Sequence, residues 1–241
     1  MANYLITGAT SGIGRECVAR LIKNENYVVA VGRDEQKLEL LTEEFKDNIC
    51  TIKYDLSNIT DIGKIFEVSR KRNIIYDGMV YAAGVDMLCP IKVNSIEKTR
   101  YVMDVNCFAF IEMGKYFYKK QFSKANSSIV AISSISSLTN DIGMMSYSAS
   151  KAALNSVVKT MSKEFLNRKI RVNAVLPAGV DTAMANKKNE LLKRTSDDII
   201  KQQGLGLIPV AQIIDEIVFL LSDNAEYMTG ELITISGGAR Y

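Results

Sequence analysis

Short apolar runs alternate with amphipathic stretches along almost the whole chain, and this alternation limits the folds that are open to it. The runs have the length and the β-branched composition of strands, whereas stretches such as Gln36–Phe45 and Ile59–Arg72 have helical spacing. Apolar strands separated by helices form parallel sheets covered on both faces. The pattern therefore predicts one α/β domain over residues 1–241, a doubly wound sheet of about seven parallel strands. The predicted strands are Tyr4–Thr7, Tyr27–Val31, Ile49–Tyr54, Gly78–Ala82, Ser128–Ile132, Arg171–Val175 and Leu232–Ile235.

The composition excludes several classes of protein. There is no histidine, and the four cysteines form no Cys-x-x-Cys pair, so no zinc-ligand pattern exists and we expect no metal. We expect these cysteines to be reduced, mostly buried thiols of a cytoplasmic protein. The formal charge of +3 is spread along the chain, which argues against a nucleic-acid partner. No apolar stretch is long enough to predict a membrane span or a signal peptide.

Glycines cluster where the first predicted strand meets the first helix, in the run Thr7-Gly8-Ala9-Thr10-Ser11-Gly12-Ile13-Gly14. Glycine lets the backbone turn tightly and approach a pyrophosphate, and the helix that begins here favours the anion. A tight strand-to-helix turn needs glycine in any case, so the cluster alone is weak evidence. Its place in the alternating pattern is what favours a dinucleotide site.

Tyr147 and Lys151 lie four residues apart, and Ser134 lies thirteen residues before the tyrosine. Residues at this spacing share one face of a helix, so the phenol and the ammonium can reach one site. Because the chain lacks histidine, proton transfer must use another group. A phenol has a pKa of about 10, so we expect a nearby positive charge to lower the pKa of Tyr147.

The same spacing recurs at Tyr116 and Lys120, so the pair alone is not specific. Thirteen residues before this tyrosine stands Met103, which cannot bind an oxyanion. We therefore predict a pair on a helix surface or an interface there.

The glycine turn resembles the cofactor signature of the short-chain dehydrogenase/reductase family, and the resemblance continues to the end of the chain. The chain departs from the family pattern in two places: Tyr81 and Ala82 replace a pair of asparagines, and Ala178 replaces a glycine. The matching motifs are Thr7-Gly8-x3-Gly12-Ile13-Gly14, Asp55-Leu56, Tyr81-Ala82-Ala83-Gly84, the set Asn106, Ser134, Tyr147 and Lys151, then Asn173, Pro177–Thr182 and Ser236-Gly237-Gly238.

The resemblance implies a Rossmann-type fold and an oxidoreductase that moves hydride between a nicotinamide and a carbonyl or secondary alcohol. It implies that Tyr147 donates a proton to the carbonyl oxygen and that Ser134 hydrogen-bonds the same oxygen. Lys151 would hold the nicotinamide ribose and lower the pKa of the tyrosine, and Asn106 would anchor a water that links the lysine to solvent. Neighbouring strand residues face opposite sides, and the family's thirteen-residue spacing selects Ser134 over Ser133.

The resemblance also assigns the residues that contact the dinucleotide. Besides Tyr147 and Lys151, they are Gly8, Thr10, Ser11, Gly12, Ile13, Gly14, Arg33, Asp55, Leu56, Ala82, Ala83, Gly84, Pro177, Val180 and Thr182.

The end of the second predicted strand bears on which dinucleotide is bound. An NAD-binding unit carries a carboxylate there for the adenosine ribose, and this carboxylate would repel a 2′-phosphate. By comparison with the family, that position is Gly32, and Arg33 follows it. A guanidinium can clamp a phosphate, so we predict NADP(H), with NAD(H) as the alternative. Against this preference, many NADP-preferring relatives have a second basic residue where this chain has Ser11.

Within the family, the length and the ending Ser222–Gly230 are similar to the bacterial 3-oxoacyl-[acyl-carrier-protein] reductases. This implies a small-molecule or acyl-carrier-bound carbonyl substrate and a homo-oligomer, either a tetramer or a dimer. The polar segment 183–208 is either a lid over the site or an ordinary surface excursion. Four basic residues either receive an acidic carrier or are merely solvated: Lys119, Lys120, Lys124 and Arg168. Candidates for an apolar substrate wall are Leu138, Ile142, Met144, Met145, Met184 and Leu191.

Two other functions stay open at this point. Relatives with the same core act on sugars, steroids and other small ketones or alcohols. A hypothesis from another class is a sensor or scaffold that binds the cofactor but catalyses no reaction. The intact set of four catalytic residues argues against this hypothesis.

Overall fold

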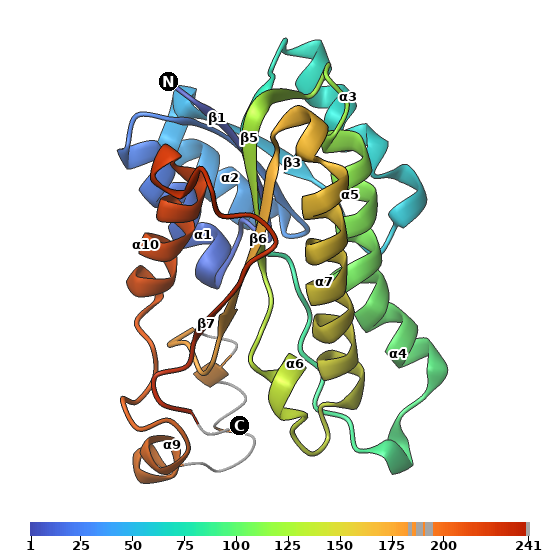
Figure 1. Ribbon diagram of the computed structural model, residues 1–241, viewed down its shortest axis with the longest axis vertical. Coiled ribbons are helices and arrows are strands. Elements are labelled where there is room, and N and C mark those ends of the chain that lie inside the picture. The colour runs from blue at the N-terminus through green and yellow to red at the C-terminus, as the bar shows by residue number, and fades with distance from the viewer. Residues whose placement is uncertain (183–184, 187–189, 191–194, 240–241) are drawn as a thin grey trace.

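A seven-stranded parallel sheet with the order β3-β2-β1-β4-β5-β6-β7 forms the centre of the computed structural model (Figure 1). The structure describes residues 1–182, 185–186, 190 and 195–239. β2 and β3 are added on one side of β1, and β4 to β7 are added on its other side. This reversal of strand order confirms the predicted doubly wound fold. The strands are β1 (Asn3–Thr7), β2 (Tyr27–Gly32), β3 (Ile49–Lys53), β4 (Tyr76–Tyr81), β5 (Ser123–Ile132), β6 (Arg171–Pro177) and β7 (Leu232–Ile235).

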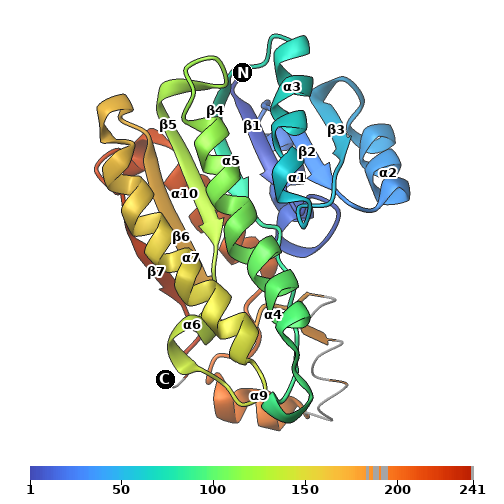
Figure 2. The ribbon, with the colours of Figure 1, turned by 90° about the vertical axis from the view of Figure 1, so that its right-hand side faces the viewer.

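Helices cover both faces of the sheet (Figures 1 and 2). One face is covered by α1 (Gly12–Lys23), α2 (Glu35–Phe45) and α10 (Val210–Leu221). The opposite face is covered by α3 (Gly63–Lys71), α5 (Ala109–Phe117) and α7 (Met145–Glu164). The other helices named below are α4 (Ile96–Met103), α6 (Ser136–Thr139) and α9 (Ser196–Gln202).

Each face of the sheet has its own apolar core. The core under α3, α5 and α7 is rich in aromatic residues, and Phe66 and Tyr76 meet edge to face with ring centroids 6.3 Å apart. The core under α1, α2 and α10 is mainly aliphatic, with residues such as Val28, Leu38 and Ile213. β6 is buried along its whole length, as expected of a strand covered on both faces.

Several strands begin or end one or two residues from their predicted bounds, and two elements differ more. β5 begins at Ser123, five residues before the predicted start, because Ser123 pairs with Tyr76 although the residues after it are polar. The predicted helix Ile59–Arg72 is divided into a 3-10 turn at Ile59–Asp61 and α3. None of the described helices is long and apolar enough to cross a lipid bilayer.

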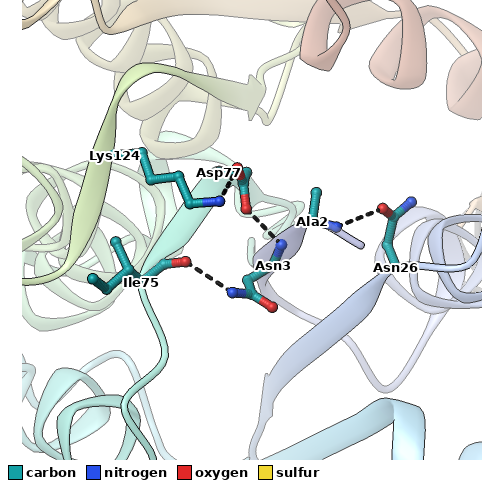
Figure 3. A network of polar contacts seen from close by, with 6 residues as sticks. All are labelled: Ala2, Asn3, Asn26, Ile75, Asp77 and Lys124. Atoms are coloured by element: carbon teal, nitrogen blue, oxygen red, sulfur yellow. Dashed lines mark hydrogen bonds and ion pairs between the residues drawn. The ribbon is translucent and has the colours of Figure 1, made fainter.

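Polar contacts hold the amino ends of the central strands together (Figure 3). The Asp77 carboxylate accepts a hydrogen bond from the Asn3 backbone N–H at 2.8 Å and pairs with the Lys124 ammonium at 2.7 Å. The Ala2 backbone N–H donates to the Asn26 side-chain oxygen at 3.2 Å. These contacts join the starts of β1, β4 and β5.

Candidate active site

A cavity of about 740 Å³ opens at the carboxyl ends of the strands. Its walls include residues from the segments that follow all seven strands, β1 to β7. In Figure 2, α6 and α9 lie beyond these strand ends. Apart from Gly14 and Asn106, every residue predicted to be catalytic or to bind the cofactor lines the cavity: Gly8, Thr10, Ser11, Gly12, Ile13, Arg33, Asp55, Leu56, Ala82, Ala83, Gly84, Ser134, Tyr147, Lys151, Pro177, Val180 and Thr182.

The turn between β1 and α1 requires its glycines. Gly8 has a φ of +66°, and a Cβ there would lie 2.7 Å from the Ala83 nitrogen. A Cβ on Gly14 would lie 2.2 Å from the Gly8 oxygen, so Gly14 packs beneath the turn instead of lining the cavity. Ser11 begins α1 without a side-chain hydrogen bond to the helix. The first N–H groups of α1 therefore stay available to an anion, so the turn fits a pyrophosphate.

The start of α7 brings the predicted catalytic groups together. Tyr147 lies in its first turn, and the Lys151 ammonium lies 5.7 Å from the centre of the Tyr147 ring. The Ser134 hydroxyl hydrogen-bonds the Tyr147 side chain and accepts a hydrogen bond from the Ser136 backbone N–H at 3.1 Å. The Ser133 hydroxyl donates instead to the Lys151 backbone carbonyl at 3.4 Å. Ser134 is therefore the serine whose hydroxyl meets the phenol.

The pKa values of the pair differ from the expectation. Burial, and next the negative charge of Asp86, raise the pKa of Tyr147 to about 12. Burial lowers the pKa of Lys151 to about 8, although Asp86 opposes that change. The Lys151 ammonium donates to the Ile132 carbonyl at 2.7 Å instead of to the phenol. The expected lowering of the tyrosine pKa is thus wrong for this structure, because the effect of burial dominates.

Asn106 is fully buried in a π-helical turn, Asp104–Phe108, between α4 and α5. Its side-chain oxygen accepts from the Val85 N–H at 2.8 Å, and its amide donates to the Val85 carbonyl at 3.0 Å. The amide also donates to the Ser150 hydroxyl at 2.9 Å, which donates to the Tyr147 carbonyl at 2.7 Å. Asn106 therefore connects the segment after β4 to the helix that carries Tyr147.

Basic side chains lie at the other end of the cavity, after β2. A Cβ on Gly32 would lie 2.5 Å from the Thr10 methyl group, so a side chain at the usual carboxylate position would require Thr10 to move. Arg33 donates to the Tyr101 hydroxyl at 2.8 Å. The Asp34 carboxylate caps α2 by accepting from the Lys37 N–H at 3.2 Å and lies 3.5 Å from the Lys37 ammonium.

Lys37 also lines the cavity, and the sequence interpretation missed it. Its place in the first turn of α2, just after Arg33, was a usable signal. Many NADP-preferring relatives have their second basic residue at the position of Ser11. In this chain, Lys37 supplies a second positive charge instead.

The described part of the segment 183–208 is anchored beside the cavity. The buried side chain of Gln203 accepts from the Gly179 N–H at 2.8 Å and donates to the Gly179 carbonyl at 3.0 Å. Val180 forms a parallel bridge with Ile208. Residues 183–184, 187–189 and 191–194, which include Met184 and Leu191, lie outside the described residues.

The expected apolar wall is wrong for the residues that the structure describes. Ile142 is 96% exposed, and Leu138 and Met145 are about half exposed, so they face solvent. Met144 is buried outside the cavity. The segment lines the cavity instead with Ile135, Ser136, Thr139 and Asp141. The reason is that α6 and the turn after it direct polar groups inward.

The second tyrosine–lysine pair lies away from the cavity. Tyr116 packs on Phe66 with ring centroids 5.3 Å apart, and the Lys119 ammonium lies 4.4 Å from the Tyr116 ring centre. Lys120 is exposed. The prediction of a surface pair is therefore consistent with this geometry.

The four basic residues weighed as a carrier surface lie near the start of β5. The Lys124 ammonium pairs with Asp77, and the Arg168 guanidinium donates to the Ser123 carbonyl at 2.6 Å. β5 has ten residues, so this end of the strand is about 30 Å from the cavity. Lys124 and Arg168 thus bind groups of the protein itself, at the end of the sheet that is far from the cavity.

The chain matches the short chain dehydrogenase family over residues 2–193. It belongs to this family. It is 32% identical to the 3-oxoacyl-[acyl-carrier-protein] reductase of Rickettsia prowazekii (strain Madrid E), across 97% of this chain and 95% of that protein. It is also 32% identical to the reductase of the same name from Thermotoga maritima, across 97% and 96%. The family resemblance inferred from the motifs is confirmed.

Solved structures of other short-chain dehydrogenases have the same fold. A 4-hydroxyisoleucine dehydrogenase complexed with NADH superposes with a TM-score of 0.90 at 28% identity, covering 99% of this chain and 98% of that one. A glucose/ribitol dehydrogenase from Brucella melitensis gives a TM-score of 0.90 at 27% identity, covering 100% and 97%. The chain is therefore an oxidoreductase of the short-chain dehydrogenase family that uses a nicotinamide dinucleotide.

Proposed function

We propose that this protein reduces a carbonyl group with NADPH, and that its substrates are 3-oxoacyl thioesters. The observation that carries the proposal is the contact of Ser134 with Tyr147 beside Lys151, in a cavity that also contains the glycine turn. Bound there, the nicotinamide would deliver hydride to the carbonyl carbon.

The chain's own residues would manage the proton and the charge. With a pKa of about 12, Tyr147 stays protonated near neutral pH and is able to donate a proton to the carbonyl oxygen. Ser134 donates a second hydrogen bond to that oxygen and stabilises its developing negative charge. Lys151, one turn along α7, faces the nicotinamide ribose and supplies the positive charge that favours proton loss from the phenol.

The substrate class rests on the relatives. The most similar curated proteins include 3-oxoacyl-[acyl-carrier-protein] reductases, and an acetoacetyl-CoA reductase of Acinetobacter is 28% identical to this chain. Both names describe reduction of a 3-oxoacyl thioester. The structural neighbours include a 4-hydroxyisoleucine dehydrogenase and a glucose/ribitol dehydrogenase. A small hydroxy compound or a sugar is therefore the second candidate substrate.

The preference for NADPH rests on the basic end of the cavity. Arg33 and Lys37 line it, and the Asp34 carboxylate is occupied at the start of α2. Two cations without a free ribose-binding carboxylate favour a 2′-phosphate.

A second copy of the chain is the proposed partner. Phe108 is 42% exposed and Ile111 is 40% exposed at the start of α5, which leaves apolar surface for a dimer or tetramer. Sedimentation velocity of the purified protein measures this assembly directly.

The activity is tested with Tyr147→Phe and a matched control, Tyr116→Phe. We expect wild-type protein to oxidise NADPH in the presence of acetoacetyl thioester, and Tyr147→Phe to lower kcat about 100-fold or more through loss of the proton donor. The control removes a hydroxyl from the other tyrosine–lysine pair and should retain wild-type kcat. Equal rates for wild type and Tyr147→Phe would refute the assigned acid. Binding of NADPH without turnover of any carbonyl would favour a sensor.

The cofactor preference is tested with Arg33→Ala and the exposed control Arg70→Ala. Loss of a charge-assisted contact to the 2′-phosphate is expected to weaken NADPH binding about tenfold or more. Affinity for NADH, which has no such phosphate, should change little. Titration of nucleotide fluorescence measures both, and equal effects on NADH and NADPH would contradict the proposed contact.

A further inference from the structure

The side chain of Gln203, just after α9, is held by hydrogen bonds although it belongs to none of the sequence motifs. It is 5% exposed, and its amide pairs with both backbone groups of Gly179. The amide oxygen accepts from the Gly179 N–H at 2.8 Å, and the amide nitrogen donates to the Gly179 carbonyl at 3.0 Å. The same nitrogen donates to the Gly206 carbonyl at 2.5 Å. The amide therefore binds the Gly179 backbone as a neighbouring strand would.

Two glycines leave the space that this side chain fills. A Cβ on Gly179 would lie 3.0 Å from the Gln203 side-chain oxygen, and a Cβ on Gly237 would lie 3.0 Å from the side-chain nitrogen. The backbone of Gln203 is fixed as well, because it forms an antiparallel bridge with Ala239. The Leu205 N–H also donates to the Gly237 carbonyl at 2.8 Å. Gln203 is thus enclosed between the segment after β6 and the segment after β7.

The segment after β6, residues 177–182, lies between the catalytic serine and the glycine turn. At one end, the N–H of Ile135, the residue after that serine, donates to the Pro177 carbonyl at 3.1 Å. At the other end, a Cβ on Gly12 would lie 3.6 Å from the Thr182 methyl group. A ligand that extends from the glycine turn to the catalytic serine would therefore pass along this segment.

This placement decides which half of a dinucleotide the segment would contact. In the proposed mechanism, the pyrophosphate lies at the glycine turn and the nicotinamide lies beside Tyr147. The 2′-phosphate of the adenosine would bind Arg33 at the end of β2, which is four strands from β6 and thus about 19 Å away. The segment after β6, whose Val180 and Thr182 line the cavity, would therefore contact the nicotinamide half.

The backbone of Gly179 depends on Gln203 for one of its two groups. The Ile208 N–H donates to the Gly179 carbonyl at 2.9 Å, and the Ile208 carbonyl accepts from the Asp181 N–H at 2.9 Å. Among the described residues, the Gln203 side chain is the one acceptor for the Gly179 N–H. Without it, a partly buried donor loses its partner, and glycine restricts backbone rotation less than any other residue. The direction in which the chain enters Val180 would then no longer be fixed.

We propose that Gln203 is a positioning residue whose amide fixes the Gly179 backbone, so that Val180 and Thr182 meet the nicotinamide half of the dinucleotide. The inference rests on the proposed function, which places hydride transfer beside Tyr147, and deepens it. Because the amide acts through Gly179, its loss weakens contacts to the nicotinamide and spares those to the adenosine half.

The test compares two ligands that differ by the nicotinamide, NADPH and 2′-phospho-ADP-ribose. We expect Gln203→Ala to weaken NADPH binding about tenfold and to change the affinity for 2′-phospho-ADP-ribose by less than about twofold. Gln212→Ala changes an exposed glutamine on α10 and should leave both affinities at their wild-type values. Isothermal titration calorimetry measures both affinities. The pair NADH and ADP-ribose gives the same comparison for a protein that prefers NAD(H).

Gln203→Met separates the hydrogen bonds from the packing. Methionine has a similar length but lacks the amide, so this variant should lose NADPH affinity as Gln203→Ala does. Melting curves check that each variant is folded. Wild-type NADPH affinity in Gln203→Met would show that packing alone matters and would overturn the proposal. Equal weakening of NADPH and 2′-phospho-ADP-ribose in Gln203→Ala would overturn it as well, because a general loss of structure affects both ligands alike.

The binding assay keeps this inference separate from the proposed activity. If the wild type binds NADPH but reduces no carbonyl, the proposed reduction fails, whereas the ratio of the two affinities still measures the role of Gln203. If carbonyl reduction is observed but the ratio is the same in the wild type and Gln203→Ala, the activity stands and the positioning role is refuted.

Discussion

Burial acts in opposite directions on the two side chains of α7 that face the cavity. It keeps Tyr147 protonated and favours the neutral form of Lys151, whose ammonium is satisfied by the Ile132 carbonyl. Both changes disfavour charge within the cavity before a cofactor enters. In the proposed mechanism, the charge of the bound dinucleotide changes this balance, because each added charge shifts the pKa of both Tyr147 and Lys151.

The lowered pKa of Lys151 predicts how stability depends on pH. The folded protein releases this proton near pH 8, whereas the unfolded chain keeps it to about pH 10.5. At this residue the unfolded state therefore binds more protons between these values, and the contribution of Lys151 to stability rises with pH there. The free-energy cost of the charged lysine, on the order of 3 kcal/mol, is fully present below about pH 8.

Lys151→Met removes that cost, so its melting temperature relative to the wild type should be highest near pH 7 and fall toward pH 10. Thermal melts across this range measure the difference. Lys201→Met, which changes an exposed lysine, should show a difference that is nearly constant with pH. A constant difference for Lys151→Met as well would contradict the lowered pKa.

At the scale of elements, the β1–α1 turn positions the cavity through close backbone contact. Gly8 lies against the backbone after β4, and Gly14 lies against Gly8. The ends of β1 and β4 and the start of α1 can therefore pack closely, because neither glycine has a side chain. The contact directs the first turn of α1 toward the cavity. In the proposed site no side chain would be needed to hold the anion, because the N–H groups at the start of α1 would bind it.

Gly14→Ala should therefore be severe, since its Cβ would meet a backbone oxygen that cannot move aside. We expect a loss of about 2 kcal/mol or more of unfolding free energy, together with loss of dinucleotide binding. Gly204→Ala is the control, because nothing lies within 4 Å of the added atom, and its effect should stay within about 0.5 kcal/mol. Urea unfolding and nucleotide titration provide the two readouts. Normal affinity in Gly14→Ala would show that the turn does not hold the pyrophosphate.

At the scale of the whole molecule, one sheet carries two cores, and one cavity is lined by residues from the segments that follow all seven strands. Polar contacts at the amino ends, such as Asn3 with Asp77, fix the opposite edge (Figure 3). A ligand in the cavity therefore contacts segments from residue 8 to beyond residue 200. Its binding energy adds to the stability of the entire fold.

NADPH at 100 times its Kd should thus raise the melting temperature by about 5 to 10 °C. The binding contributes about 2.7 kcal/mol, and a domain of this size gains about 2–4 °C for each kcal/mol. Differential scanning calorimetry with and without the nucleotide measures this shift as a single transition. Arg33→Ala should show a smaller shift at the same NADPH concentration, and no shift in the wild type would contradict the proposed site.

Local patterns in the sequence were enough to predict the fold and to place the proposed catalytic pair on one helix face. The apolar runs predicted the parallel sheet, because strands covered on both faces must be apolar along their length. Tyr147 and Lys151 were predicted to share a face because helical spacing depends only on neighbouring residues. The choice of Ser134 over Ser133 likewise agrees with the contact to the phenol, although both serines lie just after the end of β5.

Only the tertiary structure decided which side chains enter the cavity and which forms they prefer there. Ile142 is apolar yet exposed, whereas Asp86 and Lys37 are charged and line the cavity, because chain segments distant in sequence determine their surroundings. The direction of the Tyr147 pKa change followed from burial, which no spacing of residues reveals. The sequence determined the fold and the spacing of the proposed reacting groups through local periodicity, while long-range packing decided the charge and shape of the space around them.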